Sequence, residues 1–253
     1  MGQEVSIDVL AARERCKKYR RRILDISQKG PAHVAPALSC LEIVDVIYHE
    51  LKRPEDVFIL SKGHGCLAQY VVLESLGVDT SNYGGHPDYG NPGIYASTGS
   101  LGHGLGLGVG MAYAEQLKGS DIDVYVVMSD GELQEGSTWE AVQMAGNLRL
   151  RNLILFVDLN DYGGMEQLSK THRAVYPVGD KFRSFGWSCS DVNGHEALQL
   201  YDCGMVRSVL FPAVVICHTV KGKGVAIMEA DPPNWHYKSP TKEQYEKALA
   251  DLA

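Results

Sequence analysis

The chain has 253 residues, 45% of them hydrophobic and 22% charged, which is enough to bury a sizeable core and matches an ordinary soluble protein. Its formal net charge of −7 argues against a nucleic-acid-binding protein, which would need a basic surface. No apolar run approaches the roughly 20 residues that span a bilayer, and the N-terminal segment lacks the apolar core of a signal peptide, so we expect a cytoplasmic protein without a membrane segment.

Apolar periodicity and turn residues predict helices and strands that alternate along the chain. The expected helices cover residues 7–27, 39–51, 66–76, 135–148, 179–185, 196–210 and 241–252. The expected strands cover residues 57–60, 124–128, 153–157, 187–192 and 213–218. This alternation favours one α/β domain over residues 1–253, with a doubly wound, mostly parallel sheet flanked by helices.

Two further segments stand out between these elements. Residues 79–101 are rich in turn-forming residues, and a loop of this length inside a compact domain is usually functional. The glycine run from Gly102 to Gly110 does not fit the G-x-G-x-x-G nucleotide-binding pattern in any frame. Small residues at every fourth position of a helix instead predict close packing against another backbone.

The stretch from Asp130 to Asn160 is the most informative part of the chain. Asp130-Gly131-Glu132 follows one expected strand, and Asn160 follows the next. A strand, a helix and a second parallel strand place Asp130 and Asn160 at the edge of the sheet where open α/β sheets bind ligands. Their oxygens and a loop carbonyl suit Mg²⁺ or Ca²⁺ shared with a diphosphate, and Gly131 leaves room for a phosphate. Taken singly, each such pair of residues is more often a turn.

The 30-residue spacing from Asp130 to Asn160, with QEG, WEA and AGNLRLRNLI inside it, resembles the thiamine diphosphate motif of the transketolase family. Ser129 stands where that motif usually has its first glycine. The resemblance extends over nearly the whole chain, through the segments DVFILSKGHGCLAQYVVL, GHPDYGNPGIYASTGSLGHGL and VICHTVKGKGVAIMEADPPNWHYKSP.

The resemblance implies a set of functional residues. Those expected to bind thiamine diphosphate are Lys62, His64, Gly99, Ser100, Leu101, Asp130, Gly131, Glu132, Asn160, Lys221 and His236. Mg²⁺, or Ca²⁺ or Mn²⁺ in its place, would be held by Asp130, Asn160 and the backbone carbonyl of Tyr162. The expected catalytic residues are His33, His86, His103, Glu135 and His236.

The implied reaction is transfer of a two-carbon ketol unit from a ketose to an aldose, with sugars or sugar phosphates as substrates. Histidines suit this reaction because their ordinary pKa lies near neutrality. Glu135 matches a family glutamate that relays charge between cofactor sites across the subunit interface. Because a full transketolase is more than twice this length, we expect the N-terminal subunit of a split enzyme. Its partner would be a C-terminal subunit with the pyrimidine-binding domain, in an α2β2 assembly.

Two departures from the family pattern concern the substrate. Pro36 falls where many relatives have a cofactor-contacting Ser or Gly, and Tyr237 replaces the glycine after the WH histidine. The open alternatives are a subunit of a deoxyxylulose-phosphate-synthase-like or acyl-transferring thiamine diphosphate enzyme in specialised sugar or secondary metabolism, and a non-enzymatic cofactor-binding or regulatory subunit. His49, His172 and His195 have no matching context, and we assign them no functional role.

Overall fold

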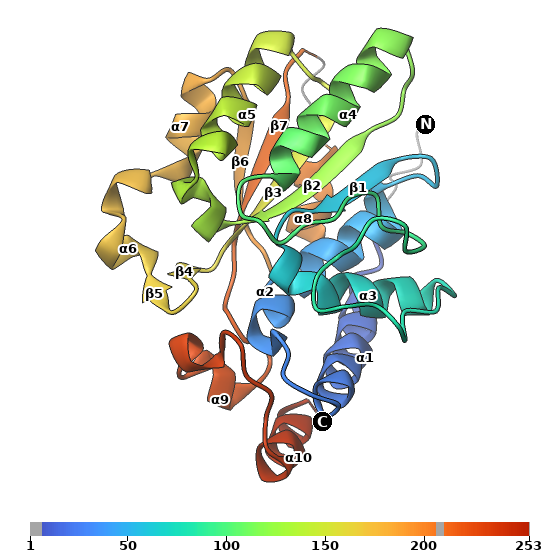
Figure 1. Ribbon diagram of the computed structural model, residues 1–253, viewed down its shortest axis with the longest axis vertical. Coiled ribbons are helices and arrows are strands. Elements are labelled where there is room, and N and C mark those ends of the chain that lie inside the picture. Colours follow the sequence, from blue (N-terminus) through green and yellow to red (C-terminus); the bar gives the residue numbers. More distant parts are fainter. Residues whose placement is uncertain (1–6, 206–209, 253) are drawn as a thin grey trace.

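A five-stranded parallel sheet forms the centre of the computed structural model, which describes residues 7–205 and 210–252 (Figure 1). The strand order is β1-β2-β3-β7-β6, and every neighbouring pair is parallel. The strands are β1 (Val57–Leu60), β2 (Val124–Ser129), β3 (Leu153–Leu159), β6 (Ser188–Asn193) and β7 (Ala213–His218). The predicted α/β fold class with a mostly parallel sheet is therefore confirmed.

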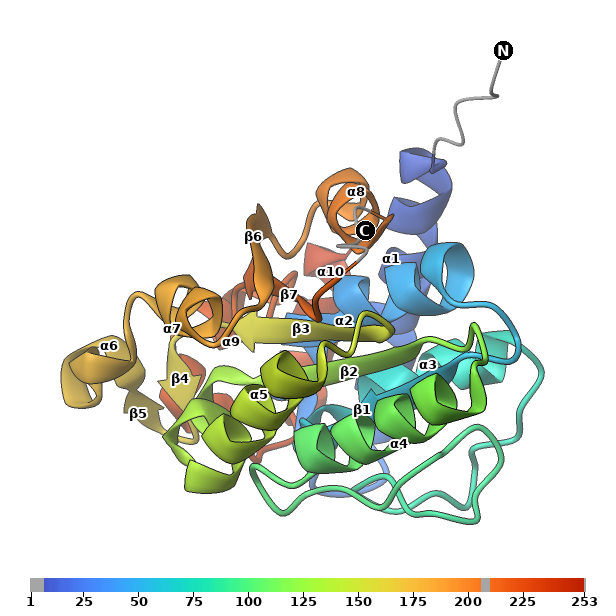
Figure 2. The same ribbon diagram turned by 90° about the horizontal axis from the view of Figure 1, so that it is seen from above.

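Helices cover both faces of this sheet. In Figure 2, α4 and α5 lie on one side of the sheet, and α1 and α8 lie on the other. The helices are α1 (Val9–Ser27), α2 (Val34–Val46), α3 (Cys66–Ser75), α4 (Gly104–Lys118), α5 (Gly136–Leu148), α6 (Leu168–Thr171), α7 (Val178–Ser184), α8 (Ala197–Met205), α9 (Ala226–Glu229) and α10 (Lys242–Asp251). None of the helices within the described ranges is both long and apolar enough to cross a membrane.

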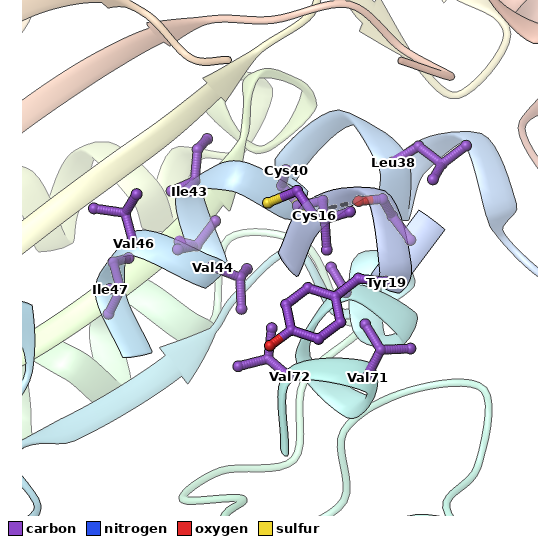
Figure 3. Close-up of a cluster of buried hydrophobic side chains, with 14 of the residues drawn as sticks. Cys16, Tyr19, Leu38, Cys40, Ile43, Val44, Val46, Ile47, Val71 and Val72 are labelled. Atoms are coloured by element: carbon purple, nitrogen blue, oxygen red, sulfur yellow. Dashed lines mark hydrogen bonds between the residues drawn. The ribbon is translucent and has the colours of Figure 1, made fainter. Parts of the chain in front are cut away.

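The core divides into two layers because successive side chains of a strand point to opposite faces. In β2, Tyr125 and Val127 pack with α1, α2, α3 and α8, whereas Val126 and Met128 pack with α4, α5 and α7. Figure 3 shows the first layer around Tyr19, where side chains of α1, α2 and α3 meet. A sheet covered on both faces needs apolar residues at nearly every position, which explains why β2 and β3 are continuous hydrophobic runs.

The structure differs from the expected elements mainly at their ends. Helix α2 begins at Val34, five residues before the expected start at Ser39, because Pro36 lies in the first turn, where its missing N–H leaves no helical hydrogen bond unmade. A helix expected over 196–210 is present as α8 up to Met205; residues 206–209 lie outside the described part. Helices α6 and α9 and the hairpin of β4 (Tyr162–Gly163) and β5 (Glu166–Gln167) are too short to give a periodic signal.

The glycines of α4 confirm the expected close packing, but only on one face. A Cβ placed on Gly104 would lie 2.4 Å from Ser61 Oγ and 2.6 Å from Ser61 Cα. A Cβ on Gly108 would lie 2.6 Å from Val126 Cγ2 of the sheet. By contrast, Gly106 and Gly110 have nothing within 4 Å of such an atom. Helix α4 thus presses one glycine face against β1 and β2 and leaves the other face open.

This asymmetry predicts opposite effects of the same substitution. Gly108→Ala should lower the free energy of unfolding by about 1–3 kcal/mol, since the added methyl group overpacks against Val126. Gly110→Ala should leave it unchanged or raise it by up to about 1 kcal/mol, because alanine favours the helix. Urea denaturation of both variants measures the difference. Equal losses at both positions would contradict the one-sided packing.

Candidate functional site

A pocket of about 400 Å³ lies at the carboxyl edge of the sheet, between the segments that follow β1, β2, β3 and β7. Parallel strands end together at this edge, so residues distant in sequence meet there. Twelve of the residues expected to be functional line this pocket: His33, Lys62, His64, His86, Gly99, Leu101, Gly131, Glu135, Asn160, Tyr162, Lys221 and His236.

Four of the expected residues do not line the pocket. Asp130 and Glu132 are buried behind its wall, each 1% exposed. Ser100 and His103 lie on the exposed start of α4, where the Ser100 hydroxyl and His103 Nδ1 are 3.2 Å apart. The structure therefore places His103 apart from the four histidines inside the pocket.

An ion pair of Lys62 and Asp158 lies at the floor of the pocket, with both side chains almost fully buried. Lys62 Nζ donates to Asp158 and, at 2.9 Å, to the carbonyl of Pro36. The hydroxyl of Ser39 contacts both carboxylate oxygens of Asp158, at 2.8 and 2.9 Å, and the hydroxyl of Thr219 donates to one of them. Every charge in this cluster is thus matched by donors or acceptors of the chain, as a buried ion pair requires.

The ion pair also fixes the protonation of Lys62. Burial alone would favour the neutral amine, but the adjacent Asp158 carboxylate outweighs it and raises the pKa of Lys62. Lys62 is therefore a permanent cation under the pocket. The amide nitrogen of Asn160 extends the cluster, since it lies 3.0 Å from Ser39 Oγ.

Four histidine rings surround the open part of the pocket. The ring of His33 lies 5.7 Å from His64, 5.7 Å from His86 and 5.3 Å from His236, measured between centroids. The ring of Tyr237 packs against His33 on the other side, at 4.5 Å. These distances leave the ring nitrogens close enough to act on one small polar molecule.

Burial keeps these rings uncharged. Burial lowers the pKa of His33 and of His236 to about 4, and the charge of Lys221 adds to the effect on both. The pKa of His64 is also far below its ordinary value, through burial and then the charge of Lys62. A neutral imidazole both donates and accepts a hydrogen bond, so His33, His64 and His236 can exchange protons with hydroxyl and carbonyl oxygens.

Lys221 forms the other cationic wall of the pocket. Its Nζ lies 2.6 Å from the carbonyl of Gly164 and 3.2 Å from His236 Nδ1, and it lies over the ring of Tyr162. Burial, and then repulsion by Lys62, lowers the pKa of Lys221 to about 8. Two lysines facing one pocket without a matching surplus of carboxylates favour an anionic ligand.

A candidate cation site lies where β2 and β3 end. Asp130 accepts hydrogen bonds from the backbone N–H groups of Asp161, at 2.6 Å, and Gly131, at 2.9 Å. Burial, and then the charge of Asp158, raises the pKa of Asp130 to about 7. No three His, Cys, Asp or Glu side chains within the described residues are grouped to hold a metal. A cation here would instead combine the Asp130 carboxylate with the amide oxygen of Asn160 and a backbone carbonyl, all of them hard oxygen ligands.

Glu132 holds the surrounding loops together. Its carboxylate accepts hydrogen bonds from the hydroxyl of Ser61 and the backbone N–H groups of Ser129, at 2.8 Å, and Gly102, at 3.3 Å. The ends of β1 and β2 and the approach to α4 are joined in this way. Within the chain itself, Glu132 has structural partners and does not reach the pocket.

Sequence reasoning missed Asp158, Ser39 and Thr219. The available signal was Asp158 itself, a lone charge in the otherwise apolar strand β3, where both faces of the sheet are covered. A buried carboxylate in such a strand needs a buried partner. Ser39 and Thr219 gave no signal, because each lies in an ordinary local context.

Comparison with known proteins gives one family throughout. The family model described as the transketolase thiamine diphosphate binding domain matches residues 21–233. One of the two subunits of an apulose-4-phosphate transketolase from Phocaeicola vulgatus is 37% identical, over 94% of this chain and 92% of that protein. A 6-deoxy-6-sulfo-D-fructose transketolase subunit from a Clostridium species is 33% identical, over 90% of each.

Longer relatives match over a part of their length. Human transketolase is 31% identical over 88% of this chain and 39% of its own. The crystal structure of transketolase from Campylobacter jejuni superposes with a TM-score of 0.86 at 24% identity, covering 97% of this chain and 43% of that one. The chain thus spans about 40% of these single-chain proteins, and the structural match shows a shared fold.

Removal of Asp158 should be strongly destabilising. Asp158→Ala leaves Lys62 buried without its counter-charge, and we expect a loss of about 3–5 kcal/mol in the free energy of unfolding. The double variant Lys62→Met with Asp158→Leu removes both charges and should recover most of that loss. Chemical denaturation of the three proteins forms the test. A double variant as unstable as Asp158→Ala would show that the charges themselves are not the main constraint.

Lys221 should make anion binding depend on pH. Since the pKa of Lys221 is about 8, its charge is present below pH 8 and lost above it, so affinity for inorganic pyrophosphate should fall as pH rises from 7 to 9.5. Calorimetry on the wild-type chain and on Lys221→Met measures this. Subtracting the variant's profile removes the titration of pyrophosphate itself. Parallel profiles for the two proteins would mean that Lys221 does not face the anion.

Proposed function

This chain belongs to the transketolase family, and we propose that it is the diphosphate-binding subunit of a two-component transketolase that uses thiamine diphosphate and Mg²⁺. The main support is the pocket itself, in which three neutral histidines and two lysines from separate segments meet at the carboxyl edge of the sheet. The nearly full-length match to relatives named as transketolase subunits supports a separate chain for this half of the enzyme.

The residues around the candidate cation site fit the diphosphate end of the cofactor. Asp130, the Asn160 side chain and the Tyr162 carbonyl would hold Mg²⁺, and Lys221 would pair with the diphosphate. Gly131 lines the same wall, so the backbone can approach a phosphate there. When bound, thiamine diphosphate supplies the carbanion that carries a two-carbon ketol unit between sugars.

The histidines would act on the sugar. His33, His86 and His236 would accept protons from, and return them to, hydroxyl and carbonyl oxygens of the substrate. Their positions are constrained: Gly99 has a φ of +132°, and a Cβ there would lie 2.7 Å from the ring of His86. Tyr237 narrows the same side of the pocket by packing on His33. We therefore propose a ketose donor and an aldose acceptor whose shape is selected in part by Tyr237.

A second polypeptide would complete the enzyme. Helix α4 exposes Leu107, Tyr113 and Leu117, and the adjacent Leu101 is also exposed while lining the pocket. An apolar surface that continues into a polar pocket favours a partner that covers both. We propose the pyrimidine-binding subunit of a transketolase as this partner, in an assembly of two copies of each chain. Glu135, exposed at the pocket rim, would then face the partner.

The proposed function predicts activity only in the mixture of both subunits. The chain, its candidate partner, thiamine diphosphate, Mg²⁺ and a ketose donor should together release aldose, and the chain without the partner should release none. A coupled assay for the aldose measures both conditions. Turnover by the rigorously purified chain alone would contradict a divided active site.

Substitution of the histidines separates substrate handling from cofactor binding. His33→Ala and His236→Ala should reduce the rate of the assembled enzyme by about 10²–10⁴-fold and change thiamine diphosphate affinity only a few-fold. His172→Ala is the matched control, since this histidine lies outside the pocket and contacts the hydroxyl of Thr171. Loss of cofactor affinity in step with activity would identify His33 and His236 as binding residues instead.

A further inference from the structure

His195, to which sequence reasoning assigns no role, contacts the segment that carries Lys221 into the pocket. It follows β6 and lies outside the pocket, in the wall of a separate cavity of about 650 Å³. Its side chain is 9% exposed and lies between α2 and the end of β7. Neither His195 nor its partner Glu42 touches the pocket of the candidate site.

The hydrogen bonds of His195 define its protonation. The backbone N–H of Val220 donates to His195 Nε2 at 2.8 Å, so this nitrogen carries no proton. The proton therefore lies on Nδ1, which is 3.1 Å from Glu42 Oε2. The other carboxylate oxygen of Glu42 accepts from Arg20. Although burial acts against it, the donors His195 and Arg20 lower the pKa of Glu42, which keeps the acceptor for Nδ1 charged.

Glycine explains how His195 reaches Val220. A Cβ on Gly194 would lie 2.4 Å from Thr219 Cγ2 and 3.0 Å from Cys217 Cβ. The turn after β6 is therefore pressed directly against the end of β7, and Gly194 N–H donates to the carbonyl of His218 at 2.8 Å. Any side chain at position 194 would move His195 away from the Val220 amide.

The segment from Thr219 to Gly224 is held from several sides, and His195 supplies the contact nearest to Lys221. Thr219 is bonded to Asp158, Gly222 N–H donates to Ala35 at 3.1 Å, and the carbonyl of Lys223 accepts from Arg20 at 3.0 Å. The side chain of Val220 is 39% exposed, so packing does little to fix this residue. The backbone just before Lys221 depends on the hydrogen bond to His195.

We propose that His195 and Glu42 are positioning residues for Lys221. Glu42 holds His195 in the tautomer with Nδ1 protonated, His195 in turn holds the Val220 amide, and Lys221 is thereby directed at the diphosphate. The proposal rests on the proposed function, because it takes Lys221 to be the lysine that pairs with that anion. Partners of this kind commonly orient groups that contact a ligand without touching it themselves.

Two near-isosteric substitutions separate the two hydrogen bonds of His195. In His195→Gln, the amide oxygen can take the place of Nε2 and still accept from Val220. In His195→Asn, the shorter amide can reach Glu42 but leaves Val220 without an acceptor. We expect His195→Asn to weaken the binding of inorganic pyrophosphate with Mg²⁺ by about tenfold, and His195→Gln to retain most of the affinity.

Glu42→Gln tests the tautomer by a different route. Because Arg20 occupies one oxygen position, the amide NH₂ of the new side chain would face His195 Nδ1 and favour a proton on Nε2 instead. That proton would oppose the Val220 N–H, so Glu42→Gln should behave like His195→Asn. Hydrogen exchange of the 219–224 backbone should be faster in both variants than in the wild-type chain and in His195→Gln.

Lys221→Met distinguishes this inference from the function on which it rests. Pyrophosphate binding that is unaffected in Lys221→Met would contradict the proposed role of Lys221. Loss of binding in Lys221→Met combined with wild-type affinity in both His195→Asn and Glu42→Gln would overturn the positioning role alone. Equal weakening in His195→Gln and His195→Asn, in step with their thermal unfolding midpoints, would also overturn it. If His195→Asn is too unstable to assay, Glu42→Gln carries the comparison.

Discussion

The buried ion pair of Lys62 and Asp158 is the interaction on which the remainder of the site depends. Placing two charges in an apolar interior is costly unless each finds its full set of partners. Here those partners come from different elements: Ser39 from α2, Asn160 from the end of β3 and Thr219 from the end of β7. Satisfying one carboxylate therefore draws the walls of the pocket together.

The same ion pair governs the chemistry above it. Because Asp158 keeps Lys62 charged, the pocket has a fixed positive charge under the histidines, and the pKa values of His33, His64 and His236 are lowered by that charge as well as by burial. Neutral rings around a cationic floor would attract an anion and still be able to exchange protons with a sugar. A single charge cluster thus serves both structure and electrostatics.

Much of the fold and of the candidate site could be predicted because it is encoded locally. Apolar runs identified all five strands of the main sheet, and residues that follow such runs, such as Asn160, reach the ligand edge by geometry alone. Asp158 and its partners could not be predicted in the same way, since its hydrogen bonds reach 119 residues back to Ser39 and 61 residues on to Thr219. His195 was missed for the same reason: its local sequence does not show that Glu42 lies 153 residues away in the chain and beside it in space.

The hub around Asp158 has a consequence for how the protein is made. Ser39 and Thr219, whose hydroxyl oxygens lie 3.2 Å apart, are separated by 180 residues. During synthesis, the first helices and strands leave the ribosome well before Thr219, so Asp158 and Lys62 must wait without one of their partners. Contacts of such long range close late and slowly. The pocket is therefore a product of complete folding, and a nascent chain cannot present it to cofactor or partner before β7 has joined the sheet.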